Sequence, residues 1–306
     1  MSPNSRPLVS VVMATYNRSN ILPYSIGSLT RSTFSDWELH VVGDACTDDT
    51  GAVVAAMGDP RIGFVNLPEN CGDQSGPNNE GVRLARGKYL AFLNHDDLWL
   101  SSHLELAVGA LERHDDDMVF TMGLVLGPGL EPLMLASATS FTHYHPWMDI
   151  RATLWVMRRE VADRVGPWRR ASEIRRIPSQ DWIHRAWKRG TCIRHVPEVT
   201  ALLLTSAAQD RVYSRRLDAD QRAAFSGLDD EGRLVAGLLA RFASRWASHS
   251  HDLRPGPFLA EGARSVARRV LYAMGVRPPS PKYWLKYWRR GGYIRSLMRQ
   301  RGLEPK

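Results

Sequence analysis

Short runs of hydrophobic residues alternate with amphipathic stretches along the first part of the chain. Four runs are too short for helices but long enough for strands buried on both faces: 8–14, 37–42, 62–67 and 89–93. Four stretches with helical spacing follow them: 19–30, 47–57, 78–86 and 103–113. The alternation predicts an α/β fold, with helices flanking a mostly parallel, doubly wound sheet.

Small polar residues precede several of the predicted helices. Ser19 or Asn20 is expected to cap the first helix and Thr47 the second, while Asp97 or Ser101 could cap the helix at 103–113. Taken alone, a carboxylate that follows a strand is more often such a cap than a ligand.

Patterns in the following segment predict further elements. Glycine, proline and small residues dominate 124–142, which indicates a crossing loop or an edge hairpin. A strand is expected to begin at 155–157 and a short helix to span 159–165. The basic, polar stretch 169–179 is interpreted as a flap, and it leads into a helix over 180–190 that a glycine ends.

The last third of the chain predicts a helical extension, 211–306, added to an α/β domain of residues 1–210. Helical spacing recurs at 222–246 and 260–274. The segment 282–301 alternates aromatic and basic residues, and two interpretations of it stay open. It lies on an anionic membrane surface, or it packs on the protein or on the twin subunit of a homodimer.

Composition and charge narrow the class of protein. The 306 residues are 43% hydrophobic and contain no apolar run near the roughly 20 residues that span a bilayer. We therefore expect a cytoplasmic protein, which would be peripheral on the inner face of the membrane if its tail binds lipid. Residues 1–130 hold 8 Lys and Arg against 16 Asp and Glu, which argues against nucleic acid as a partner of the whole molecule. Cys46, Cys71 and Cys192 share no metal or redox spacing and are predicted to be reduced and structural.

The candidate chemistry lies at the ends of the predicted strands. The run at 89–93 leads directly to Asp96 and Asp97, and Asp44 follows the run at 37–42. Ligands bind beyond the carboxyl ends of the strands in such sheets, and paired carboxylates suit Mg²⁺ or Mn²⁺. No Gly-x-Gly-x-x-Gly follows the first strand, so a conventional dinucleotide site is disfavoured.

Four segments, in this order and spacing, resemble the GT-A, family 2 inverting glycosyltransferases: 10–18, 37–50, 78–81 and 86–99. The resemblance extends over about 8–204. It implies a nucleoside diphosphate sugar donor, a hydroxyl acceptor that is a glycan, a lipid-linked sugar or a small molecule, and Mn²⁺ or Mg²⁺ as cofactor. It also implies a role in the synthesis of cell-surface polysaccharide or glycoconjugate.

The resemblance also implies a set of donor-binding residues: Ala14, Tyr16, Asp44, Asn79, His95 and Asp96. Tyr16 would stack on or border the base, and Asp44 would bind the base or ribose. Asn79 would support the donor pocket, and His95 would donate to the sugar or to a carboxylate. Asp96 and Asp97 would hold the metal and diphosphate, with Asp97 as the direct ligand.

Asp181 is the candidate catalytic base. It lies in the first turn of a predicted helix, where a carboxylate also serves as a simple cap. Its context, Gln180-Asp181-Trp182, is similar to the helix start that supplies the base in the family, and an acceptor hydroxyl needs such a base. His195 is interpreted as a strand residue rather than as a replacement for the family's third metal ligand.

One departure from the family pattern keeps other functions in view. Asn94 stands where many members have an aspartate, which predicts weaker metal affinity. A catalytically inactive, basic protein that binds membrane or RNA is therefore one alternative. A sugar-phosphate nucleotidyltransferase is another, although no early glycine-rich, basic loop for a triphosphate is present.

Overall fold

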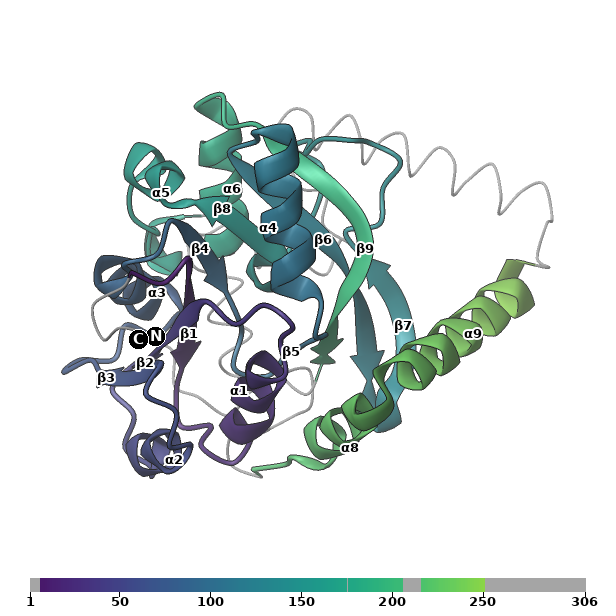
Figure 1. Ribbon diagram of the computed structural model, residues 1–306, viewed down its shortest axis with the longest axis horizontal. Coiled ribbons are helices and arrows are strands. Elements are labelled where there is room, and N and C mark those ends of the chain that lie inside the picture. The colour runs from purple at the N-terminus through teal and green to yellow at the C-terminus, as the bar shows by residue number, and fades with distance from the viewer. Residues whose placement is uncertain (1–5, 175, 206–215, 251–306) are drawn as a thin grey trace.

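The computed structural model describes residues 6–174, 176–205 and 216–250, which form one curled sheet with helices on both faces (Figure 1). The strands are β1 (Val9–Thr15), β2 (Trp37–Gly43), β3 (Ile62–Asn66), β4 (Tyr89–Phe92), β5 (Leu98–Trp99), β6 (Met118–Gly127), β7 (Glu131–Ala136), β8 (Trp155–Arg158) and β9 (Ile193–Leu204). The helices are α1 (Leu22–Thr30), α2 (Thr50–Ala56), α3 (Ser75–Leu84), α4 (His103–His114), α5 (Arg159–Val165), α6 (Pro178–Lys188), α8 (Ala219–Gly227) and α9 (Glu231–Ser250). The predicted fold class is confirmed.

The sheet has a parallel half and a mixed half. Strands β3, β2, β1 and β4 lie side by side and are all parallel, so they end at the same edge. Beyond β4 the order continues β8, β6, β9 and β5, with β8 antiparallel to both of its neighbours and β6 parallel to β9. The sequence predicted the parallel half but not the antiparallel insertion of β8.

Hydrophobic side chains cover both faces of the sheet, as the unbroken apolar runs predicted. On one face, alternate residues of β1 pack with α1, α2 and α4. On the other face Val12 packs with Leu90, Phe92 and residues of α5 and α6. Helix α3 approaches this second face so closely that a Cβ at Gly81 would collide with the side chain of Val12. A third cluster joins the ends of β6 and β9 to α8 and α9.

The predicted N-caps are wrong. Helices α1, α2 and α4 begin at Leu22, Thr50 and His103, and none of them has a side-chain hydrogen bond at its N-cap. The Ser19 hydroxyl instead donates to Asp49 at 2.5 Å, which joins two neighbouring loops. The end of α6 was predicted correctly, because Gly190 adopts a positive φ of 77° just after it.

The segments after β5 match the predictions in part. Strands β6 and β7 form the expected edge hairpin, and within the predicted flap the Ala171 amide donates to Asp73 at 2.8 Å. The helix expected over 222–246 is two helices, with a short 3₁₀ turn at Leu228–Asp230 between α8 and α9. Helix α9 lies beside β7 (Figure 1). The stretches 260–274 and 282–306 lie outside the described residues, and the domain boundary near 210 stays a prediction.

The three cysteines are unpaired, as predicted. None of the described helices combines the length and the apolar content that crossing a bilayer requires.

A buried carboxylate joins β1, β2 and the loop before β4 at the edge opposite the strand ends. Glu38 of β2 accepts hydrogen bonds from the Ser10 hydroxyl at 2.6 Å and from the Arg86 guanidinium at 2.7 Å. Burial alone would raise the pKa of Glu38, but hydrogen bonds from His40, Ser10 and Arg86 outweigh this effect and lower the pKa to about 2.

We expect Glu38→Gln to lower the free energy of unfolding by about 2 kcal/mol at pH 7, because the amide faces Arg86 without a compensating charge. The pKa of Glu38 in the folded protein lies below the ordinary value of 4.5, so this stabilisation is complete above pH 4.5 and decreases as the pH falls toward 2. Urea unfolding of both proteins should show the difference shrinking from pH 7 to pH 3. A difference that does not change over this range contradicts the assignment.

Candidate active site

The ends of β1, β2 and β4 bring several of the predicted residues together. The Asp44 amide donates to the Thr15 carbonyl at 2.8 Å, which fixes the end of β2 against the end of β1. The imidazole Nδ1 of His95, just beyond β4, lies 3.2 Å from the Ala14 carbonyl oxygen. Ala14, Asp44 and His95 therefore occupy one edge of the sheet, where the sequence placed them.

The loop after β1 holds Tyr16 and is bonded to the loop after β2. Asn17 has a positive φ of 48°, and its side-chain oxygen accepts the Thr47 amide at 2.8 Å. The side chain of Tyr16 is half-buried in this arrangement. The two loops thus form one connected surface, which is the setting expected for a residue that borders a base.

Ala45, directly after Asp44, has a strained backbone. Its φ of 57° lies in the left-handed region, which costs a residue with a Cβ about 1 kcal/mol or more. The Asn66 side chain holds the next residue in place, accepting the Cys46 amide at 2.8 Å and donating to the Cys46 carbonyl at 2.9 Å. The left-handed conformation of Ala45 and the bonds from Asn66 together set the direction in which the chain leaves Asp44.

The Asp44 side chain is buried and already has protein partners. Its two carboxylate oxygens accept the backbone amides of Cys71 and Gly72 at 2.7 and 3.1 Å. Burial nevertheless raises the pKa of Asp44, against the effect of these hydrogen bonds. Asp44 thus fastens the loop before α3 to the end of β2, and any contact with a nucleoside would use its remaining acceptor capacity.

Asp96 and Asp97 lie between β4 and β5. Asp97 is only 2% exposed, and its Oδ2 accepts a hydrogen bond from the side-chain Nδ2 of Asn94 at 2.8 Å. Helix α4 begins at His103, so Asp97 does not cap that helix. The Asp97 side chain is also more buried than its position after the end of a strand suggested. Asn94 orients Asp97 without adding a third negative charge.

The carboxylate pair fits a divalent cation. Burial and the negative charge of Asp96 raise the pKa of Asp97 well above its ordinary value, although Arg151 and the Asn94 amide act in the opposite direction. A cation beside the pair would neutralise the repulsion that opposes the ionisation of Asp97, and both carboxylates offer the hard oxygen atoms that Mg²⁺ and Mn²⁺ prefer. Asp96 and Asp97 are therefore the residues of this edge suited to hold a metal.

Asn79 of α3 binds protein backbone on both sides of its amide group. Its Nδ2 donates to the Trp168 carbonyl at 3.0 Å, and its Oδ1 accepts the Trp168 amide at 2.8 Å. Nearby, the Ser75 hydroxyl donates to the Arg169 carbonyl at 2.9 Å. Asn79 thus ties the segment at 168–171 to α3, so any support it gives to a donor pocket is through this segment.

Four aromatic side chains connect the end of β4 to the start of α6. The ring of Phe92 meets that of Trp168 edge-on, with 5.0 Å between their centroids, and Trp168 stacks on Trp182 at 5.9 Å. Trp155 lies 5.8 Å from both tryptophans. Asp181 directly precedes Trp182, so this cluster fixes the candidate base relative to the strand that leads to Asp97.

The Asp181 carboxylate is half-buried and held by arginine. Its Oδ2 accepts the Arg185 Nε at 2.9 Å, and Arg169 Nη1 lies 3.9 Å from its Oδ1. The Arg185 guanidinium also donates to the carbonyls of Val165 and Pro167, each at 2.7 Å. The Asp181 carboxylate is therefore oriented by an arginine one turn further along α6, and that arginine is held in place by its bonds to the Val165 and Pro167 carbonyls.

The family of the chain follows from comparison with known sequences. Residues 10–166, about half of the chain, match the model of glycosyl transferase family 2. The chain belongs to this family. The match includes the segments that carry Ala14, Tyr16, Asp44, Asn79 and the Asp96–Asp97 pair, and it ends before Asp181.

Relatives of this family 2 chain cover parts of it. An Escherichia coli protein named UDP-Glc:alpha-D-GlcNAc-diphosphoundecaprenol beta-1,3-glucosyltransferase WfgD is 30% identical over 113 residues, which are 37% of this chain and 44% of the relative. The matched region thus spans less than half of that protein.

Solved structures show the same fold. TarS 1–349 from S. aureus, in complex with UDP-GlcNAc, has a TM-score of 0.55 at 18% identity, covering 77% of this chain and 72% of TarS. The mannosyltransferase PcManGT from Pyrobaculum calidifontis, in complex with GDP-Man and Mn²⁺, has a TM-score of 0.52 at 17% identity over 98% of this chain and 88% of its own.

Sequence reasoning missed three residues that contact or link the candidate site residues. Arg151 acts electrostatically on Asp97, Trp168 links β4 to α6, and Arg185 orients Asp181. The spacing of Arg185, four residues after Asp181 in a helix, is a signal that would have found its pairing. His195 was placed correctly, since it is buried in β9 and stacks on Phe120.

We expect Asp44→Ala to weaken the binding of a nucleoside diphosphate sugar by about tenfold to a hundredfold, which corresponds to the loss of one or two hydrogen bonds to a charged group. Metal dependence should persist, because Asp96 and Asp97 are unchanged. Calorimetric titration of donor with and without Mn²⁺ measures both effects, and equal donor affinity in variant and parent would refute the role of Asp44.

Proposed function

We propose that this chain is an inverting glycosyltransferase that moves a sugar from a nucleoside diphosphate sugar to an acceptor hydroxyl by single displacement. The observation that carries the proposal is the convergence of Ala14, Asp44, His95 and the Asp96–Asp97 pair on one edge of a family 2 sheet. In open α/β sheets this edge is where ligands bind.

The roles of the residues follow from their positions. Tyr16 and Asp44 lie in the loops after β1 and β2 and would contact the nucleoside. Asp96 and Asp97 would hold Mn²⁺ or Mg²⁺, and such an ion neutralises negative charge on a departing diphosphate. The hydrogen bond from Asn94 and the positive charge of Arg151 both favour the ionised form of Asp97, and so they would influence the strength of metal binding.

Asp181 would act as the general base. A carboxylate that takes the proton of the acceptor hydroxyl as the new bond forms turns a weak nucleophile into an effective one. Arg185 binds Oδ2 of Asp181. The other oxygen, Oδ1, lies 3.9 Å from Arg169 Nη1 and would approach the acceptor once the Arg169 side chain moves away. Inversion requires one displacement and no covalent intermediate on the protein.

Relatives suggest the class of donor and acceptor. WfgD is named for transfer of glucose from UDP-Glc to a diphosphoundecaprenol-linked sugar, and TarS binds UDP-GlcNAc. PcManGT binds GDP-Man with Mn²⁺. These names support a nucleoside diphosphate sugar donor for this chain, a divalent metal, and an acceptor used in cell-surface polysaccharide or glycoconjugate synthesis.

A panel of nucleotide sugars tests the proposal. The protein is incubated with each donor and Mn²⁺, and released nucleoside diphosphate is measured. A glycosyltransferase releases nucleoside diphosphate from at least one donor, through slow hydrolysis when no acceptor is present. Release from no donor, or pyrophosphate production from a nucleoside triphosphate and a sugar phosphate, contradicts the proposal.

A further inference from the structure

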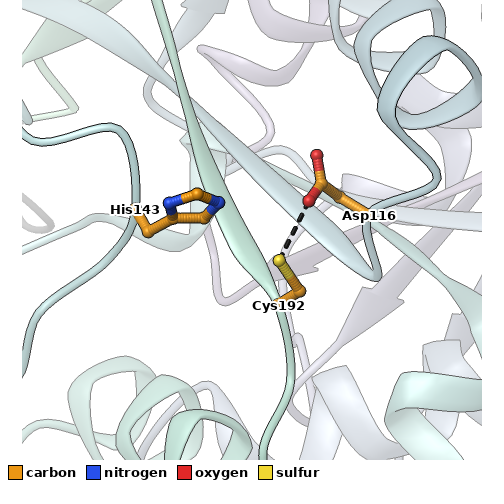
Figure 2. Close-up of side chains that lie close together, drawn as sticks. All are labelled: Asp116, His143 and Cys192. Atoms are coloured by element: carbon orange, nitrogen blue, oxygen red, sulfur yellow. Dashed lines mark hydrogen bonds between the residues drawn. The ribbon is translucent and has the colours of Figure 1, made fainter.

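Three side chains with metal-binding atoms meet away from the candidate active site. Asp116 precedes β6, Cys192 precedes β9, and His143 comes from the segment between β7 and β8 (Figure 2). One ligand atom from each lies within 4.8 Å of those of the other two. Strand β6 starts beside the beginning of β9, and through β8 it aligns with the beginning of β4, so this cluster lies at the edge opposite Asp97.

We propose that Asp116, His143 and Cys192 form a binding site for a zinc ion. A thiolate, an imidazole and a carboxylate are the three ligand types that zinc binds in proteins, and a soft sulfur ligand disfavours Mg²⁺ and Ca²⁺. A tetrahedral zinc with bonds of about 2.0–2.3 Å separates its ligand atoms by about 3.3–3.8 Å. The three atoms here are close enough to reach that arrangement by side-chain rotation.

The backbone already positions His143 beside β9. The His195 amide donates to the Thr142 carbonyl at 2.8 Å, and the Tyr144 amide donates to the Ile193 carbonyl at 2.9 Å. These two bonds pair His143 with Arg194 in an isolated antiparallel bridge, two residues from Cys192. His143 is thus held at the site by main-chain bonds that do not depend on its side chain.

The Asp116 and Cys192 side chains are also held in place. The Cys192 thiol donates to Asp116 Oδ1 at 2.9 Å, and the Cys192 amide donates to Asp117 Oδ2 at 2.8 Å. Arg194 Nε pairs with Oδ2 of Asp116, whereas Arg194 Nη2 lies 3.5 Å from Oδ1, so Oδ1 is the oxygen held less closely by Arg194 and faces the thiol. When zinc binds, the thiol proton leaves to solvent and the zinc–sulfur bond replaces the thiol hydrogen bond.

Charge and exposure suit an accessible site with an open position. Arg194 and Arg164 pair with Asp116 and Asp117, so the negative charge that attracts zinc comes from the Cys192 thiolate that forms as the metal binds. Asp116 is buried, whereas His143 and Cys192 are exposed, which leaves room for water as a fourth ligand. Zinc would fasten the segment between β7 and β8. In this segment the Ile150 carbonyl accepts a hydrogen bond from the side chain of Gln180, the residue before Asp181.

Cobalt, which replaces zinc and is coloured, tests this site separately from the active site. Metal-free full-length protein without a histidine tag is titrated with Co²⁺ and then with Zn²⁺. We expect a near-ultraviolet thiolate-to-cobalt band that saturates at one ion per chain and disappears on addition of Zn²⁺. Asp96 and Asp97 offer only oxygen atoms, so binding there gives no such band.

Variants then assign the ligands. Cys192→Ser should abolish the band, and His143→Ala should weaken cobalt binding at least about tenfold. Both positions are exposed, so circular dichroism should remain unchanged, and Cys71→Ser is the matched control that should keep the band. If Cys192→Ser does not fold, His143→Ala decides alone. Absence of the band in the parent, its persistence in Cys192→Ser, or unchanged affinity in His143→Ala overturns the proposal.

Discussion

Asp181→Asn is expected to lower turnover by about two to four powers of ten while leaving donor affinity unchanged. The amide is nearly isosteric with the carboxylate but cannot take a proton from the acceptor. Arg185 keeps its bonds to the Val165 and Pro167 carbonyls, so the start of α6 should stay in place. Nucleoside diphosphate release and calorimetric donor binding measure the two quantities.

The control for this variant is Asp163→Asn, which changes an exposed aspartate on α5 in the same way. It should leave both turnover and donor affinity as in the parent. An Asp181→Asn protein with parental turnover would show that another group accepts the proton.

Asp97→Ala is expected to abolish metal-dependent binding of nucleoside diphosphate without unfolding the protein. The variant removes one of the two carboxylates suited to the metal. Ionised Asp97 is destabilised by burial and by Asp96, so removing it relieves an unfavourable charge rather than breaking a stabilising ion pair. Calorimetry with nucleoside diphosphate and Mn²⁺, together with a thermal unfolding curve, checks both statements.

Glu198→Ala, which removes an exposed carboxylate from β9, serves as the control and should bind as the parent does. Unchanged affinity of Asp97→Ala in the presence of Mn²⁺ would remove Asp97 from the metal site.

The parallel half of the fold could be predicted because its strands are continuous apolar runs. Residues 89–93 show this most clearly, since β4 is buried along its whole length and ends at Phe92, two residues before Asn94. Such a run identifies a strand and its carboxyl end together, and the ends of parallel strands share one edge. The positions of Asp44, Asp96 and Asp97 at that edge followed directly.

The connections that shape the site could not be predicted from the order of the elements. Asn79 was expected to support a donor pocket, but its partner is the backbone of Trp168, 89 residues along the chain. The antiparallel insertion of β8 and the packing of Trp168 between Phe92 and Trp182 depend on tertiary contacts. Capping was predicted wrongly because Ser19 and Thr47 found partners in neighbouring loops instead of in their own helices.

The contact between Asp116 and Cys192 also could not be predicted from the order of the residues. Cys192 is separated by 76 residues from Asp116, and the spacing of the cysteines indicated no metal site. Only the parallel pairing of β6 with β9 brings the two residues together.

Anomalous scattering from crystals grown with Mn²⁺ and the donor's nucleoside diphosphate tests the central claim most directly. The account predicts a manganese peak within bonding distance of the Asp97 or Asp96 carboxylate and of the diphosphate, with the nucleoside between Tyr16 and Asp44. A nucleotide bound elsewhere on the protein, or manganese without contact to either aspartate, would contradict it.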